Sequence, residues 1–123
     1  MTLAAVFGFI AVVAGAFGAH GVSDPQAKEW LKTGASYNFM HAMTTFACAT
    51  FMNIGGRRAR FAPAFFLAGI VLFSGSLYAM AMGAPHWLGA VTPFGGLLFL
   101  AGWAVLIWAG LTVDQDPNPE MPG

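Results

Sequence analysis

The feature that most constrains this chain is a set of four long runs that contain no charged residue. They cover residues 1–22, 36–54, 61–82 and 88–113, and each reaches the roughly 17–25 residues that a helix needs to cross a bilayer. All of the charged residues fall between or after the runs, as expected when one mid-membrane charge costs about 3 kcal/mol or more. The runs predict an all-α membrane protein, a bundle of four transmembrane helices.

The composition argues against other classes of protein. Only 8% of the residues are charged, against about a quarter in soluble domains, and a net charge of zero without a basic stripe predicts no nucleic-acid partner. The single Cys48 excludes an internal disulfide. The first run contains Ala14-Gly15-Ala16, which resembles a signal-peptide cleavage site, but it lacks a basic leading region, so a retained helix is favoured.

The segments outside the runs predict a surface helix, an orientation and a tail. Residues 23–34 begin with a capping residue and proline and end with glycine, which indicates a short amphipathic interfacial helix anchored by Trp30. Three arginines at 57–60 outnumber the two lysines of that segment, so the positive-inside rule favours cytoplasmic N- and C-termini. Residues 114–123 are acidic and proline-rich, which is typical of a disordered tail.

Small residues recur along the first run at spacings of three and four, which gives a smooth face for close helix packing. The glycines expected to serve that packing are Gly8, Gly15 and Gly18.

Polar side chains accumulate in one half of the predicted bundle, where hydrocarbon would leave them without partners. Counting from the first connection, His20 and His41 are expected at similar depth, and the third and fourth runs bring further hydroxyl groups to the same side. Thr92-Pro93 predicts either a helix start, with free amide groups that face these residues, or a proline kink. The candidate cluster, structural or ligand-binding, is His20, Tyr37, His41, Ser74, Ser76, Tyr78 and Thr92.

The cluster has three interpretations. Neutral His20 and His41 hydrogen-bonded to neighbouring groups would stabilise helix association, and this is the favoured one. The two histidines are also weak candidates for a metal or haem site, although Cys48 lies about 10 Å along the helix from His41. A small transport or proton-relay site is the third, weakened by the absence of a carboxylate inside the runs. No paired nucleophile and base, phosphate loop or metalloprotease motif occurs, so an enzyme is not expected.

Several motifs, in order along the chain, resemble one known family. They are Gly15-Ala16-Phe17-Gly18-Ala19-His20-Gly21, Trp30, Tyr37, His41, Phe73-Ser74-Gly75-Ser76-Leu77-Tyr78, Thr92-Pro93-Phe94-Gly95-Gly96 and Gly102-Trp103. Together they resemble the bacterial YgdD and transmembrane-protein-256 family, the domain of unknown function 423. The resemblance implies a four-helix bacterial inner-membrane protein of unassigned role, with no established active site. Asn38, where that family more often carries glutamine, and the acidic tail depart from its pattern.

From the sequence we therefore expect a non-enzymatic component of the bacterial inner membrane, or an accessory subunit of a larger complex. Its expected partners are the lipid bilayer and other membrane subunits or a second copy of itself, with no cofactor. The alternative is a protein that binds or transports a small molecule, metal, haem or protons at the His/Tyr/Ser cluster.

Overall fold

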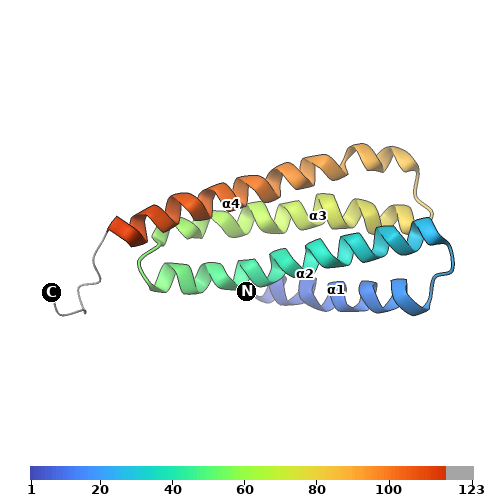
Figure 1. Cartoon of the computed structure of the whole chain (residues 1–123), viewed down its shortest axis with the longest axis horizontal. Coiled ribbons are helices and arrows are strands. Elements are labelled where there is room, and N and C mark those ends of the chain that lie inside the picture. The colour runs from blue at the N-terminus through green and yellow to red at the C-terminus, as the bar shows by residue number, and fades with distance from the viewer. Residues whose placement is uncertain (116–123) are drawn as a thin grey trace.

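The computed structural model describes residues 1–115, and that range is helical with short connections (Figure 1). Four α-helices run antiparallel in chain order: α1 (Thr2–His20), α2 (Pro25–Asn53), α3 (Ala62–Ala81) and α4 (Thr92–Gln115). Short 3-10 turns precede the last two, η1 (Arg57–Phe61) and η2 (His86–Ala90). The expected tail loses residues 114 and 115 to α4, and the rest of it lies outside the described residues.

The N-terminal part of α2 corrects the expectation of a separate surface helix over 23–34. The Asp24 side chain caps the helix by accepting a hydrogen bond from the Ala27 amide at 3.0 Å, and Pro25 occupies the first turn, as the sequence indicates. The helix then continues past Gly34 without a break. Its 29 residues extend about 43 Å, beyond the roughly 30 Å of a hydrocarbon core.

Gly34 does not end a helix because it serves a helix contact instead. A Cβ atom there would lie 2.7 Å from Cε1 of Tyr78, so only glycine allows α3 to approach α2 this closely. The glycines with positive φ lie where α2 and α3 actually end, Gly55 at 105° and Gly83 at 102°. The stop signal expected at Gly34 is therefore a packing feature.

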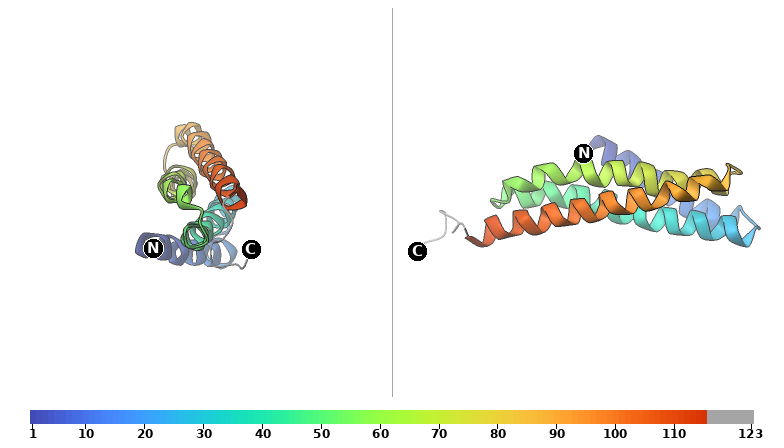
Figure 2. Two further views of the ribbon diagram at one scale, coloured as in Figure 1. Left: turned by 90° about the vertical axis from the view of Figure 1, so that its left-hand side faces the viewer. Right: turned by 90° about the horizontal axis from the view of Figure 1, so that it is seen from above.

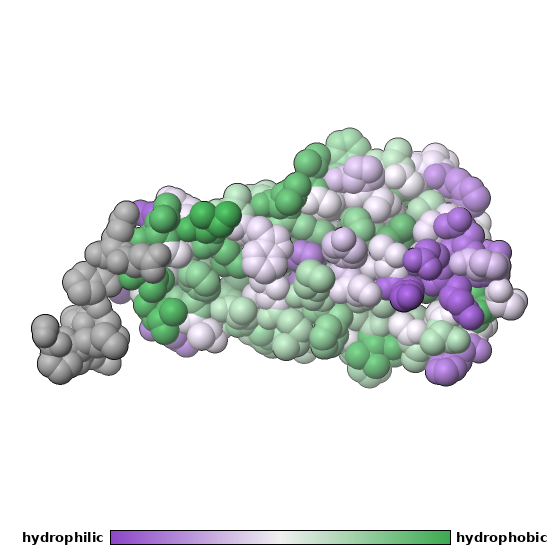
Figure 3. All heavy atoms as spheres, in the orientation of Figure 1, coloured by the Kyte–Doolittle hydropathy of each residue, from purple (hydrophilic) through white to green (hydrophobic). Residues whose placement is uncertain are grey.

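In the part of the chain that the structure describes, three segments are long and apolar enough to cross a membrane: Thr2–His20, Arg57–Ala81 and His86–Leu111. α2 is more polar than these segments because it carries Asn38, His41 and Thr45 in its middle. All three side chains are buried inside the protein. Figure 3 shows hydrophilic residues gathered at the end of the molecule where α1 joins α2 and α3 joins α4, beside a largely apolar surface. The arrangement matches a protein whose long sides face lipid.

The four helices form an open arrangement. α1 packs almost entirely on α2, α2 packs on α3, and α3 packs on α4, so α1 and α4 lie at opposite edges (Figure 2). The core lies among α2, α3 and α4, where Phe66 and Cys48 are fully buried and Phe99 is nearly so. One side of α2, between the two edge helices, is consequently left uncovered.

Of the three glycines expected to serve close packing, only Gly18 lies at a tight helix contact, and further glycines on α3 and α4 do the same. Gly18 is tight, since a Cβ there would lie 3.0 Å from the Leu31 Cβ, but Gly15 makes only an ordinary contact and Gly8 faces open space. The closest approaches are between α3 and α4. There Gly69 receives the Phe99 ring, Gly102 receives the Phe66 ring, and Gly95 lies against the backbone of Phe73.

Candidate functional site

The His41 side chain has a hydrogen-bond partner at each ring nitrogen. Its Nδ1 lies 2.8 Å from the Tyr37 carbonyl oxygen, and the indole N–H of Trp103 donates to its Nε2 at 3.1 Å. Because an indole nitrogen only donates, Nε2 must be the unprotonated nitrogen, and Nδ1 therefore carries the proton and donates to the carbonyl. The imidazole is held neutral with both nitrogens occupied, and it is only 2% exposed.

Aromatic rings complete the surroundings of His41. The Phe99 ring stacks on the imidazole with centroids 3.6 Å apart and planes inclined by 7°. The Tyr37 ring packs on Phe73 and is 40% exposed. Beside them, between α2 and α4, is a cavity of about 300 Å³ lined by Tyr37, Met40, His41, Phe73, Gly96, Phe99, Leu100 and Trp103. The site joins helices that otherwise touch little.

The two serines of the candidate cluster make separate hydrogen bonds between helices. Ser74 on α3, which is fully buried, donates to the Gly34 carbonyl of α2 at 2.7 Å. The Ser76 hydroxyl lies 2.5 Å from the Thr92 hydroxyl at the start of α4 and 2.9 Å from the Phe73 carbonyl. These bonds join α3 to both neighbours, so the hydroxyl groups are used for helix association.

The start of α4 decides between the two expectations for Thr92-Pro93. The helix begins at Thr92 after the 3-10 turn of residues 86–90, so the proline stands in the first turn rather than at a kink. The amides of Phe94 and Gly95 both bond to the Val91 carbonyl, at 3.0 and 3.4 Å. They are therefore not free to face the polar cluster.

Tyr78 belongs to a different polar pair. Asn38 on α2 donates from its side-chain nitrogen to the Tyr78 hydroxyl at 3.0 Å. Asn38 is 1% exposed, and its side-chain oxygen has no hydrogen-bond partner among the described residues. The pair lies between α2 and α3 on the side toward α1, away from the His41 cavity.

The structure does not bring His20 and His41 together. Gly18 contacts Leu31 and Gly15 contacts Ala35, so the antiparallel register sets His20 beside Trp30, about 16 Å in depth from His41. His20 is also exposed, whereas His41 is buried. The depth argument from the sequence is wrong because α2 begins at Pro25 and not at Ser36.

A metal or haem does not fit these residues well. Both ring nitrogens of His41 are engaged, and a ligating nitrogen would first have to lose Trp103 or the Tyr37 carbonyl. Among the side chains that the structure describes, no three from His, Cys, Asp or Glu gather closely enough to hold a metal ion. Cys48 lies in the buried core.

The predicted anchor Trp30, near the start of α2, contacts His86 in the turn η2 that connects α3 to α4. Its ring meets the His86 ring edge-on, with centroids 5.3 Å apart. Trp30 and His86 come from the α1–α2 and α3–α4 sides of the fold, so both connections meet at one end, which Figure 3 shows as hydrophilic. This is the position expected of a residue at headgroup depth.

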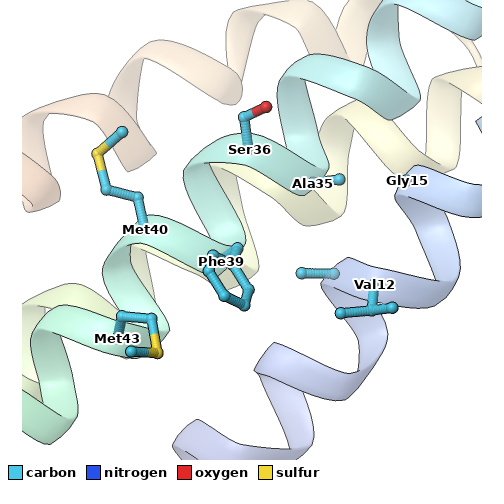
Figure 4. Close-up of a pocket in the computed structure, with 8 residues that line it drawn as sticks. Val12, Gly15, Ala35, Ser36, Phe39, Met40 and Met43 are labelled. Carbon is cyan, nitrogen blue, oxygen red and sulfur yellow. The ribbon is translucent and has the colours of Figure 1, made fainter.

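A groove runs between α1 and α2, and no described residue of α4 lines it. It has a volume of about 620 Å³ and is lined by Ala11, Val12, Gly15, Ala35, Ser36, Phe39, Met40 and Met43. Figure 4 shows Phe39 extending from α2 toward α1 near Val12. Phe39, Met40 and Met43 are each about half exposed. Met40 also lines the His41 cavity, so the two hollows are neighbours along α2.

Comparison with known proteins identifies the family of this chain. The family model described as protein of unknown function (DUF423) matches residues 14–96 of the chain. The chain belongs to this family. A "UPF0382 membrane protein" of Haemophilus influenzae is 41% identical over 111 residues, which cover 88% of this chain and 90% of the relative. The "UPF0382 inner membrane protein YgdD" of Escherichia coli K12 is 39% identical over 122 residues, 94% of this chain and 91% of the relative. No solved structure matches the chain.

The resemblance seen in the sequence is thus confirmed, and this DUF423 protein is a membrane protein of a family without an assigned role. Sequence reasoning missed Trp103 and Asn38 as parts of polar pairs. An asparagine inside an uncharged run was the available signal for Asn38, since such a side chain needs a partner in hydrocarbon. Trp103 gave a weaker signal, because tryptophan is ordinary near membrane surfaces.

Proposed function

We propose that this protein is a non-enzymatic structural component of the bacterial inner membrane that assembles with other membrane subunits. The observation that carries the proposal is the bonding of His41, whose two nitrogens are used inside the protein by the Tyr37 carbonyl and Trp103. A catalytic or ligating histidine needs a nitrogen free for proton transfer or metal. In this proposal His41 joins α2 to α4, and the protein carries no haem or metal.

The open face of α2 supports an assembly role. Phe39, Met40 and Met43 are exposed between the edge helices α1 and α4, which do not close the bundle. Helix association in lipid depends on van der Waals packing, and methionine adapts to irregular partner surfaces. A transmembrane helix of another subunit placed there would complete the arrangement.

The proposed orientation has four membrane crossings with both termini in the cytoplasm. Arg57, Arg58 and Arg60 lie in the α2–α3 connection, which the positive-inside rule assigns to the cytoplasm. Lys28 and Lys32 lie in the part of α2 at the opposite end, where its length exceeds the hydrocarbon core. Reporter fusions at the C-terminus test this: an active periplasmic phosphatase fused there would reverse the assignment.

The assembly proposal is tested by photocrosslinking in the native membrane. A photoreactive phenylalanine analogue is placed at Met40, and at Ile107 as the control, an equally apolar position that is 70% exposed on α4. We expect a discrete protein adduct from position 40 and only lipid adducts from position 107. Native mass spectrometry of the gently released protein then gives the stoichiometry. Lipid adducts alone at both positions, together with a mass equal to the bare chain, would overturn the proposal.

One observation favours a second function, the binding or transport of a small molecule. The cavity of about 300 Å³ beside His41 is large enough for a ring-sized molecule. Such a ligand would have to displace Trp103 to reach the imidazole nitrogen. Replacing His41 separates the two functions, since a structural role predicts lost stability and a binding role predicts lost ligand with the fold intact.

A further inference from the structure

A second, separate cavity lies where α1, α2 and α3 meet. It has a volume of about 210 Å³, and its wall is apolar except for two side chains: Phe7, Ile10, Asn38, Ile70, Val71, Gly75 and Tyr78 line it. α1 and α3 touch only sparsely, which leaves the space between them. Because an engineered apolar cavity of about 150 Å³ can hold benzene, this volume suits one ring or a short hydrocarbon chain.

The two polar residues of this cavity are incompletely bonded. The Asn38 side-chain nitrogen donates to the Tyr78 hydroxyl at 3.0 Å, while the Asn38 oxygen has no partner. Exchanging the amide atoms does not remove the problem, since Tyr78 would then donate to the oxygen and leave the NH₂ group unpaired. A side chain that is 1% exposed and leaves one polar atom unsatisfied is uncommon and costs stability.

The unsatisfied groups specify a ligand. The Asn38 oxygen accepts, and the Tyr78 hydroxyl, which already accepts from Asn38, can donate its own hydrogen. We propose that the cavity between α1 and α3 binds a neutral lipophile whose hydroxyl group donates to the Asn38 oxygen and accepts from Tyr78. One hydroxyl group meets both requirements, and the apolar part of the molecule occupies the space beside Phe7 and Val71.

The depth of the site requires that the head group be neutral. Asn38 lies 13 residues after the start of α2, about 20 Å from its charged end. A phosphate or carboxylate at that depth would be expensive, whereas an alcohol or phenol is not. The shared chemistry is a hydroxyl on an apolar body, which a lipid-soluble phenol and an aliphatic alcohol both carry.

The experiment observes Asn38 directly by NMR. The chain has three asparagines, so ¹⁵N-asparagine labelling of the full protein in lipid nanodiscs gives three side-chain amide signals, and Asn38→Leu identifies one of them. The probes are 4-pentylphenol, 1-nonanol and pentylbenzene, which has the shape of the phenol without the hydroxyl. We expect a saturable shift of the Asn38 signal, with the phenol or the alcohol binding about tenfold more tightly than pentylbenzene.

Variants keep the proposal testable without disturbing the polar pair. Gly75 lines the cavity and has open space around it, so Gly75→Leu is expected to fold, fill the cavity and abolish the shift. Gly8→Leu is the control, because Gly8 also faces open space but does not line this cavity. Tighter binding of the phenol or of the alcohol indicates which class of natural ligand is held. Equal binding of pentylbenzene, no saturable shift, or a shift that survives in Gly75→Leu would each overturn the proposal.

Discussion

The neighbouring glycines Gly95 and Gly96 on α4 offer a sharp test of how α3 and α4 pack. A Cβ added at Gly95 would meet the backbone nitrogen and Cα of Phe73, and it would lie only 2.7 Å from the Phe73 Cβ. A Cβ added at Gly96 would have nothing within 4 Å. Alanine raises helix propensity equally at both positions, by about 0.5–1 kcal/mol relative to glycine. The two substitutions therefore differ mainly in the contact with α3.

At Gly95 the obstacle is backbone, which cannot rotate out of the way, so α3 and α4 must separate. Overpacking of this kind typically costs about 1–3 kcal/mol, which exceeds the gain in propensity. We expect Gly95→Ala to lower the free energy of unfolding by about 1–2 kcal/mol and Gly96→Ala to leave it unchanged or slightly raised.

The assay is reversible unfolding of the full chain in bicelles, measured by steric trapping. Gly102→Ala gives an intermediate case, because its added Cβ would meet only ring atoms of Phe66, which can shift. If Gly95→Ala and Gly96→Ala had the same unfolding free energy within about 0.3 kcal/mol, the close approach of the two backbones would be refuted.

Three further predictions concern the polar pairs and the core. In a double-mutant cycle, His41→Leu and Trp103→Phe should show a coupling of about 0.6 kcal/mol and at most about 1.7 kcal/mol, and additive effects would contradict the hydrogen bond at 3.1 Å. Ser74→Ala should lower the unfolding free energy by about 0.5–1.5 kcal/mol through loss of the bond to the Gly34 carbonyl, whereas Ser36→Ala, on an exposed serine, should change it little. Cys48, which is fully buried, should resist a membrane-permeant maleimide in the native protein and react once SDS unfolds it, as mass spectrometry would report. Rapid native labelling would place the thiol outside the core.

The bounds of α1, α3 and α4 followed closely from local sequence. One charge in hydrocarbon is costly wherever it occurs, so the uncharged runs mark the helices without knowledge of their neighbours. The Asp24-Pro25 start of α2 was equally local, since a capping side chain and a proline act within one turn. The continuation of α2 past Gly34 was not local, because Gly34 is needed for the contact with Tyr78. A glycine required for packing looks the same in sequence as a glycine that stops a helix.

The partners of the buried polar groups depended on tertiary structure. His41 bonds with Trp103, 62 residues away, and Asn38 with Tyr78, 40 residues away. Such pairs are set by the rotation of each helix about its axis and by the register between helices, which small changes at the contacts decide. The sequence alone determined that the chain is helical, membrane-embedded and charged only outside its apolar runs, because the cost of burying charge acts on each residue separately. Only tertiary structure decided that α1 stands apart from α4, that His20 and His41 lie apart, and that Asn38 keeps an unpaired oxygen beside a cavity, because these follow from how the helix faces fit together.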